Sequence, residues 1–77
     1  MDIKLYIGQA IRKNRNSKKW TQEKLSSEAG ISNRFLQDIE AGEKMTSLST
    51  LFKLSKALGT TPDKIIMPLW KEWIQKQ

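Results

Sequence analysis

Apolar residues recur at intervals of three or four positions along most of the chain, the spacing that gives an α-helix one buried face. No segment shows the sustained alternation of apolar and polar residues that is typical of a half-buried strand. The chain is therefore predicted to be all-α. The expected helices cover residues 3–16, 22–29, 32–41, 48–58 and 62–66, with one more short helix near the C-terminus.

Residues that start and stop helices lie at the ends of these segments. Asp2, Thr21 and Ser32 each precede an apolar pattern, and their side chains can accept a hydrogen bond from a free backbone N–H of the first turn. Gly30 and Gly59 follow the patterns, and glycine adopts the left-handed conformation that ends many helices. These signals support the predicted boundaries.

The helix over residues 48–58 is expected to lie in the core. Four leucines recur in it at spacings of three and four: Leu48, Leu51, Leu54 and Leu58.

Proline divides the C-terminal part of the chain. Thr61, Pro62 and Asp63 together are typical of a helix start, with a cap, a proline in the first turn and an acid beside it. Pro68 is expected to break that helix or to start a new one. The predicted organisation is one domain over residues 1–67 and a short helical extension over 68–77.

Composition excludes several classes of protein. The chain has 77 residues without cysteine or histidine, so disulfides and the usual transition-metal ligands are missing, and we expect no metal and no cofactor. The same absence leaves no ready nucleophile–base pair, so we do not expect an enzyme. The longest apolar stretch, 65–70, is six residues interrupted by proline, which is too short for a membrane span. We expect a cytoplasmic protein, located at the nucleoid when it is bound to DNA.

The positive charge is concentrated in the first half of the chain. The net charge is +6, and residues 1–34 hold eight bases against three acids, whereas residues 35–77 are nearly neutral. A basic half suggests a polyanionic partner on one face, although a merely solvated surface would give the same count.

Residues 21–40 form two short helices joined by a turn at Gly30, which is either a simple helical hairpin or a DNA-binding helix-turn-helix. The outward side chains of the second helix favour DNA. Arginine suits guanine, asparagine and glutamine suit adenine, and aspartate suits the cytosine amine. These side chains are Asn33, Arg34, Gln37 and Asp38.

From Ile7 to Ile66 the chain resembles the phage-repressor and Cro type helix-turn-helix proteins, which include lambdoid repressors and restriction-modification controller proteins. The resemblance is carried by the segments IGQAIRKNR, TQEKLSSEAGIS, FLQDIEAGE, SLSTLFKLSKALG and TPDKII. It implies a compact five-helix bundle of the lambda-repressor type. It also implies a bacterial or phage transcriptional regulator, repressor or autoregulator, that binds an inverted-repeat operator in double-stranded DNA as a homodimer, with residues 32–41 in the major groove.

The resemblance also assigns roles to single residues. Base contacts are implied for Asn33, Arg34 and Gln37, with Asp38 as a less certain fourth. Phosphate contacts are expected from Arg15, Thr21, Gln22, Ser32 and Lys44. Glu40 is implied to form a structural ion pair with Arg15, and Gln22 also to buttress the recognition helix.

The apolar C-terminal segment has three possible roles. It could cover the core of its own domain, form a dimer contact or lie on a membrane surface. A dimer contact is favoured, because symmetric recognition needs two recognition helices about 34 Å apart. The expected interface is Ile66, Leu69, Trp70, Trp73 and Ile74. An alternative function is an antitoxin-type module that binds a toxin partner through this face and regulates its own operon.

Overall fold

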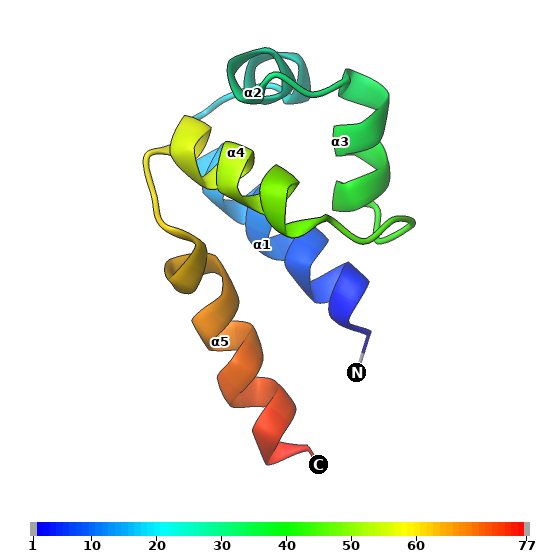
Figure 1. Ribbon diagram of the computed structural model, residues 1–77, viewed down its shortest axis with the longest axis vertical. Coiled ribbons are helices and arrows are strands. Elements are labelled where there is room, and N and C mark those ends of the chain that lie inside the picture. Colours follow the sequence, from blue (N-terminus) through cyan, green and yellow to red (C-terminus); the bar gives the residue numbers. More distant parts are fainter. Residues whose placement is uncertain (1, 77) are drawn as a thin grey trace.

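The computed structural model describes residues 2–76, and within that range it contains five helices and no strand (Figure 1). The all-α prediction is confirmed, and the first four helices lie within about one residue of the predicted ranges. The helices are α1 (Ile3–Ser17), α2 (Gln22–Ala29), α3 (Asn33–Glu40), α4 (Leu48–Leu58) and α5 (Pro62–Gln75).

Local hydrogen bonds set the ends of α2 and α3. The Thr21 hydroxyl accepts from the Lys24 N–H at 3.0 Å, and the Ser32 hydroxyl accepts from the Phe35 N–H at 3.0 Å. Each bond satisfies one of the backbone donors that a helix leaves free at its start. Between the helices, Gly30 has a φ of +70°, a conformation that glycine adopts without a steric penalty. The turn therefore follows directly from the residues at its two ends.

The five helices share one core. α1 packs against α3, α4 and α5, while α2 packs against α3 and α4. In Figure 1, α2 and α3 lie together at one end of the molecule, and α5 extends towards the opposite end. The buried apolar cluster consists of Ile7, Ile11, Leu25, Ala29, Leu36, Ile39, Leu54 and Leu58. It fixes α3 on the body of the domain through its inner face only.

A glycine allows α1 and α3 to approach each other closely. A Cβ atom built on Gly8 would collide with the backbone carbonyl oxygen of Ile39 and lie 3.0 Å from that of Glu40. Both oxygens are backbone atoms near the end of α3, so they cannot turn aside as a flexible side chain would. Gly8 is therefore the position on which the α1–α3 spacing depends.

The break expected at Pro68 is wrong, because α5 runs without interruption from Pro62 to Gln75. Proline removes the N–H that would bond the Lys64 carbonyl, but both residues are exposed, so water can hydrate that carbonyl. Ile65 and Leu69 pack against the body of the domain on either side of the proline. Residues 68–75 are the second half of α5, and no helix in the range 2–76 is long and apolar enough to cross a membrane.

The prediction that Leu48 lies in the core is also wrong. Its side chain is 64% exposed, whereas Leu51, Leu54 and Leu58 are buried as expected. Leu48 is the first residue of α4, at the edge of the leucine stripe, and the neighbouring helices leave it uncovered. Phe52, one turn further along, is 53% exposed in the same helix.

Candidate nucleic-acid interface

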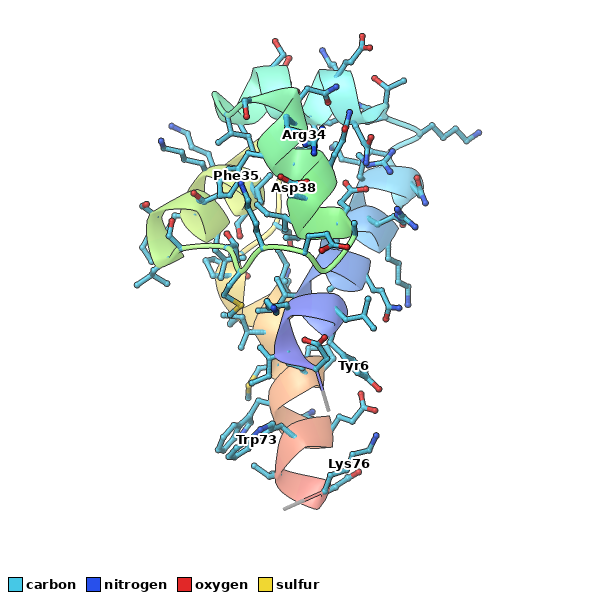
Figure 2. All side chains as sticks on the ribbon, turned by 90° about the vertical axis from the view of Figure 1, so that its right-hand side faces the viewer. Tyr6, Arg34, Phe35, Asp38, Trp73 and Lys76 are labelled. Carbon is cyan, nitrogen blue, oxygen red and sulfur yellow. The ribbon has the colours of Figure 1, made fainter. Side chains whose placement is uncertain are left out.

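α3 has an apolar inner face and a polar outer face. Leu36 and Ile39 are fully buried on the inner side, while Arg34 has 83% of its side chain exposed and Gln37 is also exposed. Figure 2 shows Arg34 and Asp38 on the outer surface of α3, at the opposite end of the molecule from Trp73. The outer face is therefore free to meet a macromolecule.

Asp38 links two cations on this face. Its Oδ1 lies 3.3 Å from Arg34 Nε, one helical turn earlier, and its Oδ2 lies 3.5 Å from Lys44 Nζ in the loop after α3. The aspartate side chain is 16% exposed, while the Lys44 side chain is 61% exposed. Phe35, beside this cluster, is half-buried and packs against the core.

Asn33 begins α3 and is half-buried. Its Oδ1 is buried and has no hydrogen-bond partner within residues 2–76. Buried acceptors in folded proteins are usually paired, so this oxygen is an acceptor whose hydrogen-bonding capacity is unused.

Glu40, the last residue of α3, is the centre of a buried hydrogen-bond network. Its side chain is fully buried and accepts from Arg15 Nε and Arg15 Nη2, each at 2.8 Å. It also accepts from Gln22 Nε2 at 3.1 Å and from Arg12 Nε at 3.4 Å. The expected Arg15–Glu40 pair is thus present and bidentate, and the network joins α1, α2 and α3.

This network determines the charge state of its members. Burial raises the pKa of the Glu40 carboxyl, but hydrogen bonds from Arg15 and Gln22 and the charge of Arg15 lower it more, so the pKa lies below its ordinary value. The hydrogen bond to Glu40 raises the pKa of Arg15 above its ordinary value. Both groups are therefore ionised at neutral pH.

The two arginines of α1 differ in how much they can offer to DNA. Arg15 is 12% exposed and also donates from Nη1 to the Trp20 carbonyl at 2.8 Å, so much of its hydrogen-bonding capacity is used inside the protein. Arg12, three residues earlier on the same side of α1, has 53% of its side chain exposed. Arg12 is not among the residues predicted from the sequence, although its spacing of three from Arg15 on a helix places it on the same side.

The remaining predicted phosphate contacts surround the start of α2 and the ends of α3. Thr21 and Ser32 are exposed capping residues, and Gln22 is half-buried with its amide on Glu40. Lys18 Nζ in the loop before α2 lies 4.8 Å from the centre of the Trp20 ring, and Lys24 Nζ in α2 lies 5.4 Å from it. Cation–π attraction at these distances gathers positive charge beside Thr21.

The predicted dimer residues form an apolar surface on α5. Trp70 and Ile74 are 48% and 45% exposed, and the rings of Trp70 and Trp73 stack with centroids 5.8 Å apart. Leu69 packs partly against the domain's own core, so the surface covers the core and also continues outward. A shallow apolar groove runs along it, lined by Ile3, Ile7, Met45, Ile66, Leu69, Trp70 and Trp73.

Comparison with known proteins places this arrangement in a family. Residues 11–65 match the family described as helix-turn-helix. Control protein C.BamHI of Bacillus amyloliquefaciens is 39% identical over 66 residues, covering 84% of this chain and 82% of that protein. Control protein C.SmaI of Serratia marcescens is 35% identical over 66 residues, covering 86% and 79%.

A solved structure gives the same result for the fold. The crystal structure of the restriction-modification controller protein C.AhdI from Aeromonas hydrophila matches with a TM-score of 0.79 and 29% identity, covering 80% of this chain and 94% of that one.

Proposed function

The chain belongs to the helix-turn-helix family and is a DNA-binding transcriptional regulator, and from that premise we propose that it binds an inverted-repeat operator as a homodimer. The single observation that carries the proposal is the outer face of α3, which combines exposed groups able to read base edges with a rigid attachment through Glu40. The sequence identity with control proteins and with a restriction-modification controller protein supports a role as the controller of a restriction-modification system.

α3 is the element proposed to enter the major groove. A helix fits this groove, and its N-terminal residues approach the base edges most closely. Asn33 and Arg34 lie in the first turn and Gln37 lies one turn further along the same exposed side. Asp38 is the fourth polar side chain of this surface. The proposed contacts are adenine for the amides and guanine for the arginine.

Positive and polar groups around α3 are proposed to hold the DNA backbone. Thr21, Gln22 and Ser32 lie at helix starts, where backbone N–H groups favour phosphate. Lys44 and the partly exposed Arg12 flank the recognition helix, while Arg15 contributes mainly through Glu40. Contacts of this kind fix the register of the helix on DNA without reading sequence.

Arg34→Ala is expected to weaken binding to the operator by about 1–3 kcal/mol and to remove the preference at one base position, because one bidentate guanine contact is lost. The operator is obtained by selecting genomic fragments with the wild-type protein, which should enrich an inverted repeat near the protein's own promoter. Affinities for the site and its single-base variants are then measured by fluorescence anisotropy.

Lys71→Ala provides the matched control, because it removes one positive charge from an exposed position of α5. It should leave the base preference unchanged. Equal base preference in Arg34→Ala and wild type would refute the assignment of Arg34, and enrichment of no sequence by the wild type would refute operator recognition itself.

The α5 surface is proposed to form the dimer. Two copies must place their recognition helices about one turn of DNA, ~34 Å, apart, and a fixed protein contact sets this distance. Exposed aromatic side chains are favoured at such contacts because each buries a large apolar area. Trp70 and Ile74 are the most exposed apolar groups among the predicted dimer residues of α5.

Trp70→Glu is expected to convert the dimer to a monomer at micromolar concentration, because it places a charge in an apolar contact. Sedimentation equilibrium measures the change. Phe52→Glu is the control, since Phe52 is 53% exposed on α4 and does not line the α5 groove. A Trp70→Glu protein that dimerises as tightly as the Phe52→Glu protein would show that the interface lies elsewhere.

A further inference from the structure

Asp38 occupies a central position on the outer face of α3. Its two carboxylate oxygens contact different cations, Arg34 on the same helix and Lys44 in the following loop. Its backbone carbonyl accepts from the Glu43 N–H at 2.9 Å and from the Lys44 N–H at 3.3 Å. Asp38 therefore positions the side chain of Arg34, which is proposed to read a base. It also positions both the backbone and the side chain of Lys44, which is proposed to contact a phosphate.

The geometry of the Arg34 contact leaves its reading edge free. Asp38 Oδ1 lies against the Nε of the Arg34 guanidinium. The two terminal nitrogens of the guanidinium carry four more N–H groups. Guanine is read by a pair of parallel hydrogen bonds to O6 and N7, which those terminal groups can supply. Asp38 can thus stay in place while Arg34 binds its base, and it limits the orientations that the exposed side chain samples.

The same pairing opposes binding to DNA of the wrong sequence. Non-cognate binding depends almost entirely on contacts between cations and phosphates. Asp38 places a negative charge between Arg34 and Lys44, and this charge offsets part of the attraction of the two cations for phosphates. At the cognate guanine the terminal nitrogens of Arg34 gain two directed hydrogen bonds to the base, so the same repulsion has a smaller relative effect.

We propose that Asp38 is a positioning residue that determines specificity through Arg34 and Lys44 instead of reading a base of its own. The proposal rests on the operator recognition proposed above. It differs from the expectation that Asp38 accepts from a cytosine amine, because each of its oxygens contacts a cation that is itself proposed to bind DNA.

The test compares Asp38→Asn with Glu43→Gln on the selected operator, on the operator with the Arg34 guanine replaced, and on random-sequence DNA. Both variants remove one negative charge from the same region, but Glu43 is exposed and makes no ion pair among residues 2–76. Asp38→Asn is expected to lower discrimination at the guanine about tenfold, and Glu43→Gln to leave it unchanged. The affinity of Asp38→Asn for random DNA should rise, with a salt slope steeper by about 0.9 for each cation released onto a phosphate.

A double-mutant cycle separates the two roles of Asp38. If Asp38 acts through Arg34, Asp38→Asn causes no further loss of base preference in the Arg34→Ala background. Exposed ion pairs contribute little to folding stability, and thermal unfolding of each variant verifies that the fold is retained.

Four results would overturn the proposal. Asp38→Asn could lose preference at a second base position, and keep that effect in Arg34→Ala, which would mean a direct base contact. It could match Glu43→Gln in every assay, which would mean a general charge effect. If Asp38→Asn discriminates at the guanine as well as the wild type does, the role assigned to Asp38 is wrong but operator recognition stands. If the wild-type protein shows no sequence preference, the proposed function is wrong as well.

Discussion

Glu40→Gln is expected to lower the free energy of unfolding by about 3–5 kcal/mol, the cost of breaking a buried ion pair by removing one partner. The Glu40 side chain is fully buried and Arg15 is 12% exposed, so the arginine cannot recover full hydration when its counter-charge is lost. Glutamine preserves the shape of the side chain but replaces one acceptor oxygen with an NH₂ group. In either orientation of the amide, that group then faces an N–H donor of Arg15.

The loss of unfolding free energy in Glu40→Gln is expected to become smaller as the pH falls. Glu40 has a pKa lowered by folding, so its contribution to stability is fully present above the unfolded pKa of about 4.3 and is lost as the pH falls through the lower folded pKa. The wild type and the variant should therefore differ most above about pH 5 and converge in stronger acid. Urea unfolding followed by circular dichroism over this pH range measures the difference.

Glu28→Gln is the control for this prediction. Glu28 also forms an ion pair, with Lys24 Nζ at 2.9 Å, and removing it changes the net charge equally. Both side chains of that pair are about half exposed, so solvent screens the interaction and little stability should be lost. Equal destabilisation by the two variants would contradict a special role for the Glu40 network.

Much of this fold can be predicted from local signals. Thr21, Gly30 and Ser32 determine where α2 ends and α3 begins, because capping bonds and a left-handed turn depend on residues next to one another in the sequence. The inner face of α3 is also evident from the spacing of Leu36 and Ile39. These features give the recognition helix its position and its outward polar face.

Features that depend on contacts between distant segments were harder to predict. The exposure of Leu48 depends on how far the neighbouring helices extend, and the continuity of α5 at Pro68 depends on packing on both sides of it. The position of Arg12 beside Glu40 and the contact of Lys44 with Asp38 depend on side-chain positions in three dimensions, whereas the spacing of Arg34 and Asp38 on one helix already indicates that pair. Periodicity identifies a buried face but carries no information about which side chains meet across it.

Gly8→Ala is the second large effect expected on stability, a loss of about 2–3 kcal/mol. In an exposed helix the same change would stabilise by about 1 kcal/mol, because alanine has the higher helix propensity. Here the new methyl group collides with the backbone carbonyl oxygens of Ile39 and Glu40, which lie at the C-terminal end of α3. The two helices must separate, and a separation at this point also strains the bonds from Arg15 to Glu40.

The direction in which Gly8→Ala shifts the unfolding midpoint distinguishes the effect of helix packing from that of helix propensity. Thermal unfolding should show a lower midpoint for Gly8→Ala, although propensity alone predicts a higher one. Gly59→Ala is the matched control, because Gly59 has a φ of +69° and nothing lies within 4 Å of the added methyl group. Its expected cost, about 1–2 kcal/mol, is conformational only.

The two glycine variants should also differ in DNA binding at temperatures where both are folded. Gly59 lies at the end of α4, so its replacement leaves α3 in place and operator affinity should match the wild type. Gly8 contacts the end of α3 directly, and a shift there moves Arg34 and Gln37 relative to the groups that hold the DNA backbone. Displacements of this kind weaken recognition because base contacts require defined geometry. Wild-type stability and affinity in Gly8→Ala would mean that α1 and α3 can separate without cost, and the close approach at Gly8 would then not position the recognition helix.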